Sequence, residues 1–261
     1  MVNLSSLVLS LLLQALSLPP AVPEAERMQI ALTQQDYPPL IVYGVPPSGL
    51  LTDIVRESFK LSKVDASFVA VPNNRAIVGV MQDFYDGSYG WAHSPERDVK
   101  LLYSNKPIYF LRIGFFQRAG EEFNWVKLAD LSGMKIGITQ GNYYSEEFAR
   151  LVATGVLGTD SAPSDVSNFK KLLIGRIDLF PIDFDSGQYL LKNHFSAAER
   201  QKIQMQGKPI SVVPVYLVIR RNLLHAKELM TRFDRGFQQL SDTGQLARLS
   251  DVYKQQLHAQ P

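Results

Sequence analysis

Arg97 is the residue with the clearest potential to bind a ligand. It follows the strand predicted at residues 88–91 by a short loop. Its planar guanidinium could donate two parallel, charge-assisted hydrogen bonds to a carboxylate. A surface ion pair with Glu96 or Asp98 would be a purely structural use of the same side chain. Contact with a ligand carboxylate and that ion pair are therefore the two uses open to Arg97.

Asp183 could supply the opposite charge. It ends the strand predicted at residues 177–182, and its carboxylate could receive an ammonium group. Asp also favours the N-cap position of helices, so Asp183 could instead cap the helix predicted to begin at Phe184. Asp185 lies close by and is a competing acidic candidate.

A polar segment at residues 140–143 could bind an anion. Gly141, Asn142 and Tyr143 stand where the strand predicted at residues 135–139 turns into a predicted helix. Free backbone N–H groups and the positive end of a helix dipole both favour negative charge. Gly141 could instead serve only a tight turn.

These residues depend on an alternation of strands and helices that occurs twice along the chain. Apolar spacing in the first series places Leu51, Ile54, Val55 and Phe59 on one side of a helix. Alternation of this kind favours parallel sheets covered by helices on both faces. The first series comprises strands at 28–32, 67–71 and 88–91 and helices at 50–61 and 74–84, and the second comprises strands at 135–139 and 177–182 and helices at 142–153, 164–174 and 184–194.

Two long β-type runs, at residues 108–117 and 210–220, bracket the second series. The fold class predicted is therefore α/β, with two lobes joined by two crossing strands. We expect residues 26–112 and 208–261 to form lobe 1, and residues 113–207 to form an inserted lobe 2. Two helices predicted at 223–240 and 243–256 would return to lobe 1.

The chain begins with an apolar stretch at residues 4–18 that ends at Pro19 and Pro20. It is too short to span a bilayer, which needs roughly 20 apolar residues. Its length suits a secretory signal peptide, and we predict one at residues 1–25, with export to the periplasm. The absence of cysteine excludes a lipidated N-terminal cysteine.

The composition narrows the classes of function. The 27 Lys and Arg residues and 25 Asp and Glu residues give a net charge of +2, without long runs of either sign, so a nucleic-acid partner is not expected. No cysteine is present, and the four histidines lie far apart, so we expect neither a metal site nor a cofactor. Common hydrolase and phosphate-loop motifs are also absent. A small-molecule ligand and a monomeric protein are the predictions that remain.

A series of short motifs resembles one protein family over residues 28–253. No single motif is specific, but their order and spacing together are. They are similar to those of the bacterial extracellular solute-binding proteins of family 3, the polar amino-acid receptors of ABC importers. The motifs are Asp36-Tyr37-Pro38-Pro39, Gly49 before a helix, Arg75-Ala76, Tyr85-Asp86-Gly87, Ser94-Pro95-Glu96-Arg97, Ser104-Asn105-Lys106-Pro107-Ile108, Ile136-Gly137-Ile138-Thr139-Gln140-Gly141, Gly175-Arg176-Ile177-Asp178 and a closing helix with Gly244.

This resemblance implies a type II periplasmic-binding fold and a receptor that closes on a small polar solute, such as an amino acid or related carboxylate. The receptor would present the solute to an inner-membrane ABC permease. The expected protein is therefore a binding protein and not an enzyme.

The resemblance also assigns roles to individual residues. Arg97 matches the arginine that binds the ligand α-carboxylate, and Asp183 matches the acid that binds the α-ammonium. Tyr37 matches an aromatic residue that stacks over the ligand, and Ser94 belongs to the motif around Arg97. Arg75 sits where a second anion contact could form, although a solvated helix-terminal arginine is the alternative.

Asn142 and Tyr143 replace the small hydroxyl residues usual in the family, so the resemblance leaves the ligand open. A receptor of the same build could serve a sensor instead of an importer. Cyclohexadienyl dehydratases share the fold and would need an acid in the cleft, for which Glu146 or Glu147 are candidates.

Overall fold

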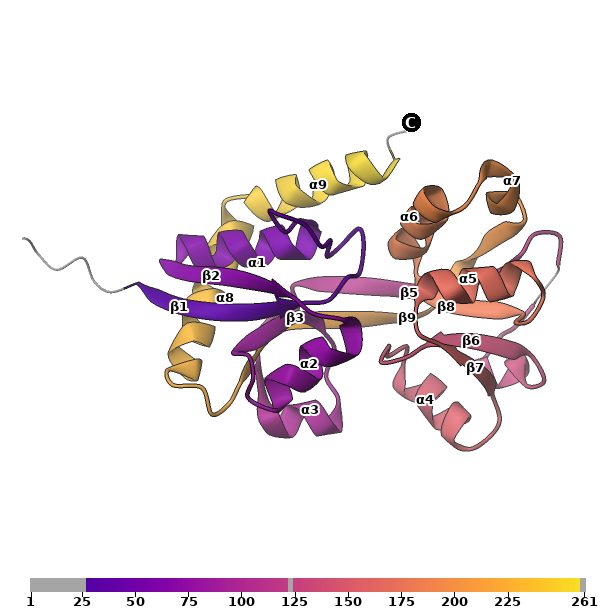
Figure 1. The fold of residues 1–261 in the computed structure, drawn as a ribbon, viewed down its shortest axis with the longest axis horizontal. Coiled ribbons are helices and arrows are strands. Elements are labelled where there is room, and N and C mark those ends of the chain that lie inside the picture. Colours follow the sequence, from indigo (N-terminus) through magenta and orange to yellow (C-terminus); the bar gives the residue numbers. More distant parts are fainter. Residues whose placement is uncertain (1–26, 122–123, 259–261) are drawn as a thin grey trace, which may run out of the picture.

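The computed structural model describes residues 27–121 and 124–258. The predicted signal peptide at residues 1–25 lies outside this part of the chain. The described chain forms an α/β structure with two lobes, as predicted, and Figure 1 shows them joined by two long strands. The strand order through the sheet is β2-β1-β3-β9-β5-β8-β6-β7, with β4 paired to β9.

The first lobe contains the elements from β1 to β4 together with the two C-terminal helices. Strand β1 pairs in parallel with β2 and β3, so the carboxyl ends of these strands meet at one edge. Its elements are β1 (Met28–Gln34), α1 (Leu50–Leu61), β2 (Val64–Ala70), α2 (Asn73–Met81), β3 (Gly87–Trp91), α3 (Pro95–Lys100), β4 (Leu101–Tyr103), α8 (Ala226–Asp242) and α9 (Gln245–His258).

The second lobe repeats this arrangement. Strand β6 pairs in parallel with β7 and β8, and their carboxyl ends lie toward the first lobe in Figure 1. The elements are the 3-10 helix η1 (Leu128–Leu131), β6 (Lys135–Thr139), α4 (Glu146–Ala153), β7 (Gly158–Ala162), α5 (Asp165–Leu173), β8 (Leu179–Asp183), α6 (Phe184–His194) and α7 (Ala197–Arg200).

Two antiparallel strands, β5 (Tyr109–Arg118) and β9 (Ile203–Arg220), connect the lobes. Strand β5 also pairs with β8, which brings Ile113 opposite Asp183. Strand β9 pairs with β3 at its other end. The crossing strands therefore belong to both lobes, and the exact boundaries between residues 112 and 113 and between 207 and 208 stay a prediction.

The helices of the first lobe form by burial of an apolar side. Leu51, Ile54 and Phe59 of α1 are buried, as the spacing predicts. Helix α8 packs against α1, with the rings of Phe59 and Phe233 5.1 Å apart. The buried apolar residues of α1 and α8 belong to one continuous hydrophobic core with those of β1 and β9. Burial of such side chains contributes most of the stability of a lobe.

The boundaries of several elements differ from the predictions. Helix α4 begins at Glu146 and not at Asn142, because Ser145 caps it by accepting a hydrogen bond from the Phe148 N–H. Strand β9 begins at Ile203 and not at residue 210. Gly207 and Pro209 lie in this additional part of the strand, where an irregularity in the pairing with β5 accommodates them.

Further elements were not predicted, namely β4, α3, β7, η1 and α7. Each of them is short. Among the described helices, none combines the length and the apolar character that a bilayer crossing requires.

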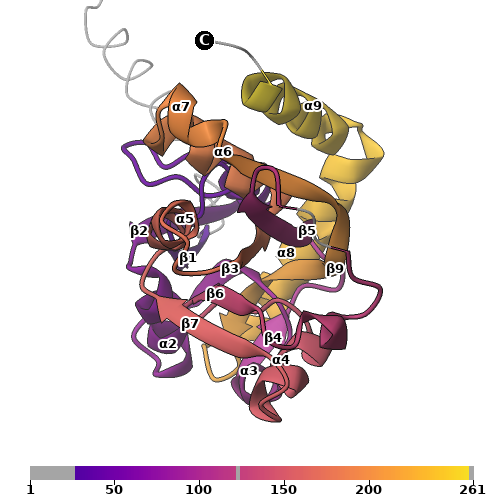
Figure 2. The ribbon, with the colours of Figure 1, turned by 90° about the vertical axis from the view of Figure 1, so that its right-hand side faces the viewer.

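Figures 1 and 2 together place α6, α7 and α9 on one side of the molecule and α2, α3 and α4 on the opposite side. Parallel β strands in both lobes direct their carboxyl ends toward the space between them. In such folds, ligands bind beyond these ends.

Candidate functional site

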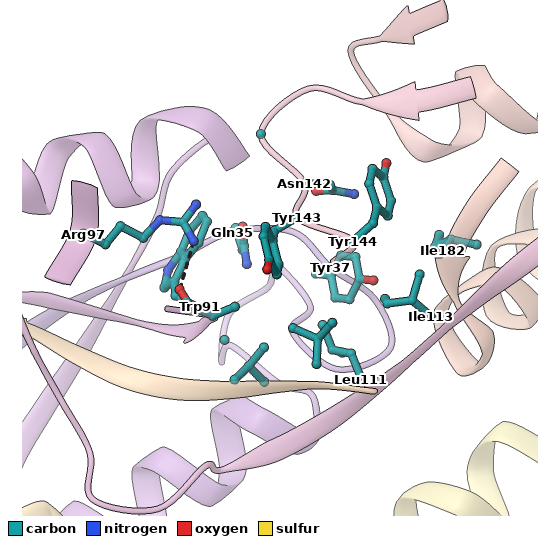
Figure 3. A pocket seen from close by; sticks show the side chains of 15 residues that line it. Gln35, Tyr37, Trp91, Arg97, Leu111, Ile113, Asn142, Tyr143, Tyr144 and Ile182 are labelled. Carbon is teal, nitrogen blue, oxygen red and sulfur yellow. Dashed lines mark hydrogen bonds between the residues drawn. The ribbon is translucent and has the colours of Figure 1, made fainter. Parts of the chain in front are cut away.

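A cavity lies between the lobes, above the two crossing strands (Figure 3). The first lobe contributes the segments after β1 and β3, together with α3, and the second contributes the turn after β6. The lining residues are Gln35, Tyr37, Gly90, Trp91, Ala92, Arg97, Leu111, Ile113, Gly141, Asn142, Tyr143, Tyr144, Ile182, Val213 and Val215. Aromatic rings and apolar side chains therefore surround a small number of polar groups.

Arg97 is held at the first-lobe wall of this cavity. One guanidinium nitrogen donates a hydrogen bond to the Ala92 carbonyl oxygen at 3.0 Å, and the guanidinium carbon lies 5.0 Å from the centre of the Trp91 ring. Ser94 caps α3 by accepting a hydrogen bond from the Arg97 N–H, which positions the residue on the helix. Burial lowers the pKa of Arg97 from its usual value.

Arg97 forms no ion pair with any acidic residue of the described chain, Glu96 and Asp98 included. Asp98 instead contacts His93, with 2.8 Å between the Asp98 Oδ1 and His93 Nδ1 atoms. Two of the guanidinium nitrogens have no acceptor among the described residues, so they can donate to a ligand. A partly desolvated arginine without an anion is suited to a carboxylate.

The turn after β6 forms the facing wall. The Thr139 N–H donates to the Tyr144 hydroxyl at 2.8 Å, and the Asn142 N–H donates to the Thr139 carbonyl at 3.1 Å. The N–H groups of Gly141 and Tyr143 have no acceptor in the described chain. These donors could bind an anion, but the helix dipole expected there starts three residues beyond Tyr143, at Glu146.

Asp183 does not line the cavity, although it lies beside it. One carboxylate oxygen accepts a hydrogen bond from the Ser186 N–H at 3.1 Å, which caps α6, and the other accepts from the Arg112 N–H at 2.9 Å. The side chain is buried, and burial raises its pKa to about 6. Asp185 accepts a hydrogen bond from the Tyr109 hydroxyl at 3.2 Å and lies 3.6 Å from an Arg112 nitrogen.

A network of polar side chains lies directly behind the turn. The Thr139 hydroxyl donates to Asp165 Oδ1 at 2.5 Å, and the Asn142 side-chain amide approaches the same oxygen at 3.5 Å. Asn168, which is fully buried, donates to the Thr139 hydroxyl at 2.9 Å. Burial raises the pKa of Asp165 to about 6. The cavity wall is thus linked through Asn142 to an acidic group that the sequence analysis did not identify.

The predicted site residues fall into two groups. Tyr37, Arg97, Gly141, Asn142 and Tyr143 all line the cavity, whereas three others do not. Those three are Asp183, Ser94, which caps α3, and Arg75, which is exposed on α2 and forms no ion pair within the described chain.

Several lining residues were not predicted as site residues. Gln35 lies two residues before Tyr37 after β1, a position from which its side chain faces the cavity in Figure 3. Trp91 supports the guanidinium of Arg97 with its ring. Tyr144 follows Tyr143 in the turn. The position of Gln35 at a strand end is the one signal that the sequence offered.

The described chain contains no group of three or more His, Asp or Glu residues that could hold a metal ion.

Comparisons with known proteins are consistent with a ligand-binding fold. A model of the bacterial extracellular solute-binding proteins, family 3, matches residues 30–256. No curated protein matches the chain.

Solved structures with the same fold include receptors and a sensor. A histidine kinase sensor domain with similarity to periplasmic binding proteins is 17% identical, with a TM-score of 0.74, over 87% of this chain and 96% of that chain. An ancestral arginine-binding protein bound to arginine is 16% identical, with a TM-score of 0.72, over 87% and 98%. An arginine transport-system periplasmic binding protein from Legionella pneumophila is 17% identical, with a TM-score of 0.71, over 87% and 99%.

Proposed function

The chain belongs to the bacterial extracellular solute-binding proteins of family 3, and from this premise we propose that it binds a small carboxylate-bearing solute, such as an amino acid, between its lobes. The observation that carries the proposal is Arg97, which lines the cavity with no acidic partner in the described chain. The similarity to an arginine-binding protein bound to arginine and to an arginine transport-system binding protein supports an amino acid as the first candidate.

Binding would proceed by closure of the two lobes. Arg97 would hold the carboxylate on the first lobe, and the N–H groups of Gly141 and Tyr143 would reach the same ligand from the second. A ligand that contacts both lobes stabilises the closed arrangement by its additional contacts there. Tyr37 would cover the remainder of the ligand. No bond is made or broken in this mechanism.

Two measurements test the proposal, a thermal-shift screen followed by calorimetry. The screen of amino acids, polyamines and small organic acids would identify the compounds that bind, because ligands of the native state raise the melting temperature. Replacing Arg97 with Ala should then weaken binding of the best carboxylate by at least ~2 kcal/mol, or roughly 30-fold.

The matched control is Arg248→Ala, since Arg248 is an exposed arginine of α9 outside the cavity. It should bind with the affinity of the wild type. Equal affinities of the Arg97→Ala and wild-type proteins for every compound would refute the proposal.

We further propose that the receptor acts outside the cytoplasm and passes its solute to an ABC permease. Uptake of the labelled solute should fall when the gene is deleted and return with the wild-type gene, but not with Arg97→Ala.

Sequencing the mature amino terminus from a periplasmic extract would locate the end of the predicted signal peptide. A monomer is expected in solution.

A sensory role is the second candidate, because a histidine kinase sensor domain shares the fold. In that case deletion of the gene would leave uptake of the solute intact and abolish the cellular response to it.

A dehydratase is the remaining alternative, and it would convert prephenate or arogenate. A purified protein that produces no turnover of either compound would exclude this activity.

A further inference from the structure

The second lobe contains three acidic side chains close to the cavity, Asp165, Asp183 and Asp185, and they differ in what their oxygens already bind. This difference predicts which one could accept a positively charged group of a ligand. The inference rests on the proposed function, since it concerns the same cavity.

Both oxygens of Asp183 already accept a hydrogen bond, so a ligand ammonium would have to share an oxygen with a backbone N–H. Its two oxygens accept the N–H groups of Ser186 and Arg112, which belong to α6 and β5. Asp185 is occupied by the Tyr109 hydroxyl and by Arg112. A ligand ammonium would compete with these bonds, which also join β5 to the second lobe.

Asp165 is different, because only one of its oxygens is used. The Thr139 hydroxyl and the Asn142 amide both approach Oδ1, while Oδ2 accepts no hydrogen bond within the described chain. Asp165 also forms no ion pair with any Lys, Arg or His of that chain. A carboxylate in this state is poorly solvated and has no compensating charge, which is costly unless a cation supplies one.

Asp165 does not itself line the cavity, but its hydrogen-bond partners connect it to the turn that does. Its partner Asn142 lines the cavity, and Thr139 is the last residue of β6 before the turn. On the opposite wall, burial raises the pKa of Tyr37, and the negative charges of Asp183 and then Asp165 raise it further, so both acids act on the same cavity residue.

We propose that Asp165, and not Asp183, receives the ammonium or another cationic group of the solute, with Asn142 and Thr139 holding its carboxylate in position. The solute would then be a zwitterion or a cation-bearing carboxylate, with its carboxylate on Arg97.

The test compares two ligands that differ only in the ammonium group. Calorimetry would measure L-glutamine against 4-carbamoylbutanoate, and L-glutamate against glutarate, using whichever pair binds the wild type. The ratio of the two affinities on one variant does not depend on how much of that variant is folded. Wild type should bind the amino acid at least tenfold more tightly than its analogue.

Asp165→Asn keeps an oxygen for Thr139 and removes the charge. It should weaken binding of the amino acid about tenfold or more and change binding of the analogue less than about twofold. Asp165→Glu should restore part of the preference. Asp183→Asn should leave the ratio unchanged, and Asp251→Asn, which removes an exposed charge from α9, should have no effect on either ligand.

The possible failures are distinguishable. If the wild type binds neither pair, or if Arg97→Ala binds as the wild type does, the proposed function is wrong for these ligands and the role of Asp165 falls with it. If binding requires Arg97 but the affinity ratio survives in Asp165→Asn or collapses in Asp183→Asn, only the role of Asp165 is wrong.

Discussion

At the scale of single residues, the site is defined by which charges are already satisfied. Arg97 is oriented by the Ala92 carbonyl and the Trp91 ring but lacks an anion in the described chain. Asp165 is held by Thr139 but lacks a cation there. Asp183 accepts a backbone N–H at each of its two oxygens. Unpaired charges of this kind reduce the stability of the free protein, and a ligand can compensate for them.

The pH dependence of stability should reveal the cost of Asp165. Burial raises its pKa to about 6, from 3.8, so the folded state binds a proton at this group more tightly than the unfolded state does. The resulting stability is fully present below pH ~4 and is lost as pH rises through ~6. Asp165→Asn carries no such charge, so it should be more stable than wild type at about pH 8, by about 1–3 kcal/mol.

Urea denaturation at about pH 8 and about pH 4 measures this difference. The advantage of Asp165→Asn should disappear at the lower pH, where Asp165 of the wild type is protonated. A difference between the two proteins that is the same at both pH values would contradict the raised pKa of the partly buried Asp165 carboxylate. Asp251→Asn serves again as the control for general charge effects.

At the scale of elements, the helices place the strand ends by close packing. Helix α8 crosses α1 at Gly236, where a Cβ atom would lie 1.8 Å from the Ser58 carbonyl oxygen. Glycine is required here because the backbones approach directly. The contact fixes α1, whose amino terminus follows the segment that carries Tyr37.

Replacing Gly236 with Ala should destabilise the protein by about 3 kcal/mol, because neither backbone can move without displacing a helix. Thermal or urea unfolding would measure the loss. Gly207→Ala is the control, since no atom lies within 4 Å of its Cβ position. If the Gly236 variant were as stable as the Gly207 variant, the close approach of α1 and α8 would be wrong.

At the scale of the whole molecule, β5 and β9 are the only strands of the described chain that run through both lobes. Their pairing is irregular around Gly114, which faces the ring of Phe184 so closely that a Cβ would lie 1.9 Å from it. Closure of the lobes would therefore pivot about two strands whose regular pairing is already interrupted near the middle of β5.

The absence of cysteine makes this motion easy to measure. Spin labels at Val99→Cys on α3 and Ala149→Cys on α4 would occupy exposed positions on the same side of the two lobes (Figure 1). Electron paramagnetic resonance should show a shorter distance between the two labels when the ligand that binds most tightly in the thermal-shift screen is added. The same ligand concentration should not shorten this distance in a protein that also carries Arg97→Ala. If the distance did shorten there, closure of the lobes would not depend on carboxylate binding by Arg97.

Much of this protein could be predicted from local patterns. Apolar spacing predicts α1 and its buried side, because the side chains of a helix return to the same face every three to four residues. The alternation of strands and helices predicts the α/β class, and the position of Arg97 after β3 predicts a place at the carboxyl edge of a sheet. Each of these inferences uses residues that are near one another in the chain.

What only the tertiary structure decided is which acid remains available. Asp183 and Asp165 both stand at the end of a strand or the start of a helix, and the same residue type suits a cap or a ligand contact at either position. The Arg112 N–H that occupies Asp183 lies 71 residues away in sequence, and Thr139, which holds Asp165, lies 26 residues away. Hydrogen-bond satisfaction depends on such distant partners, so the chain must fold before a free carboxylate can be told from an occupied one.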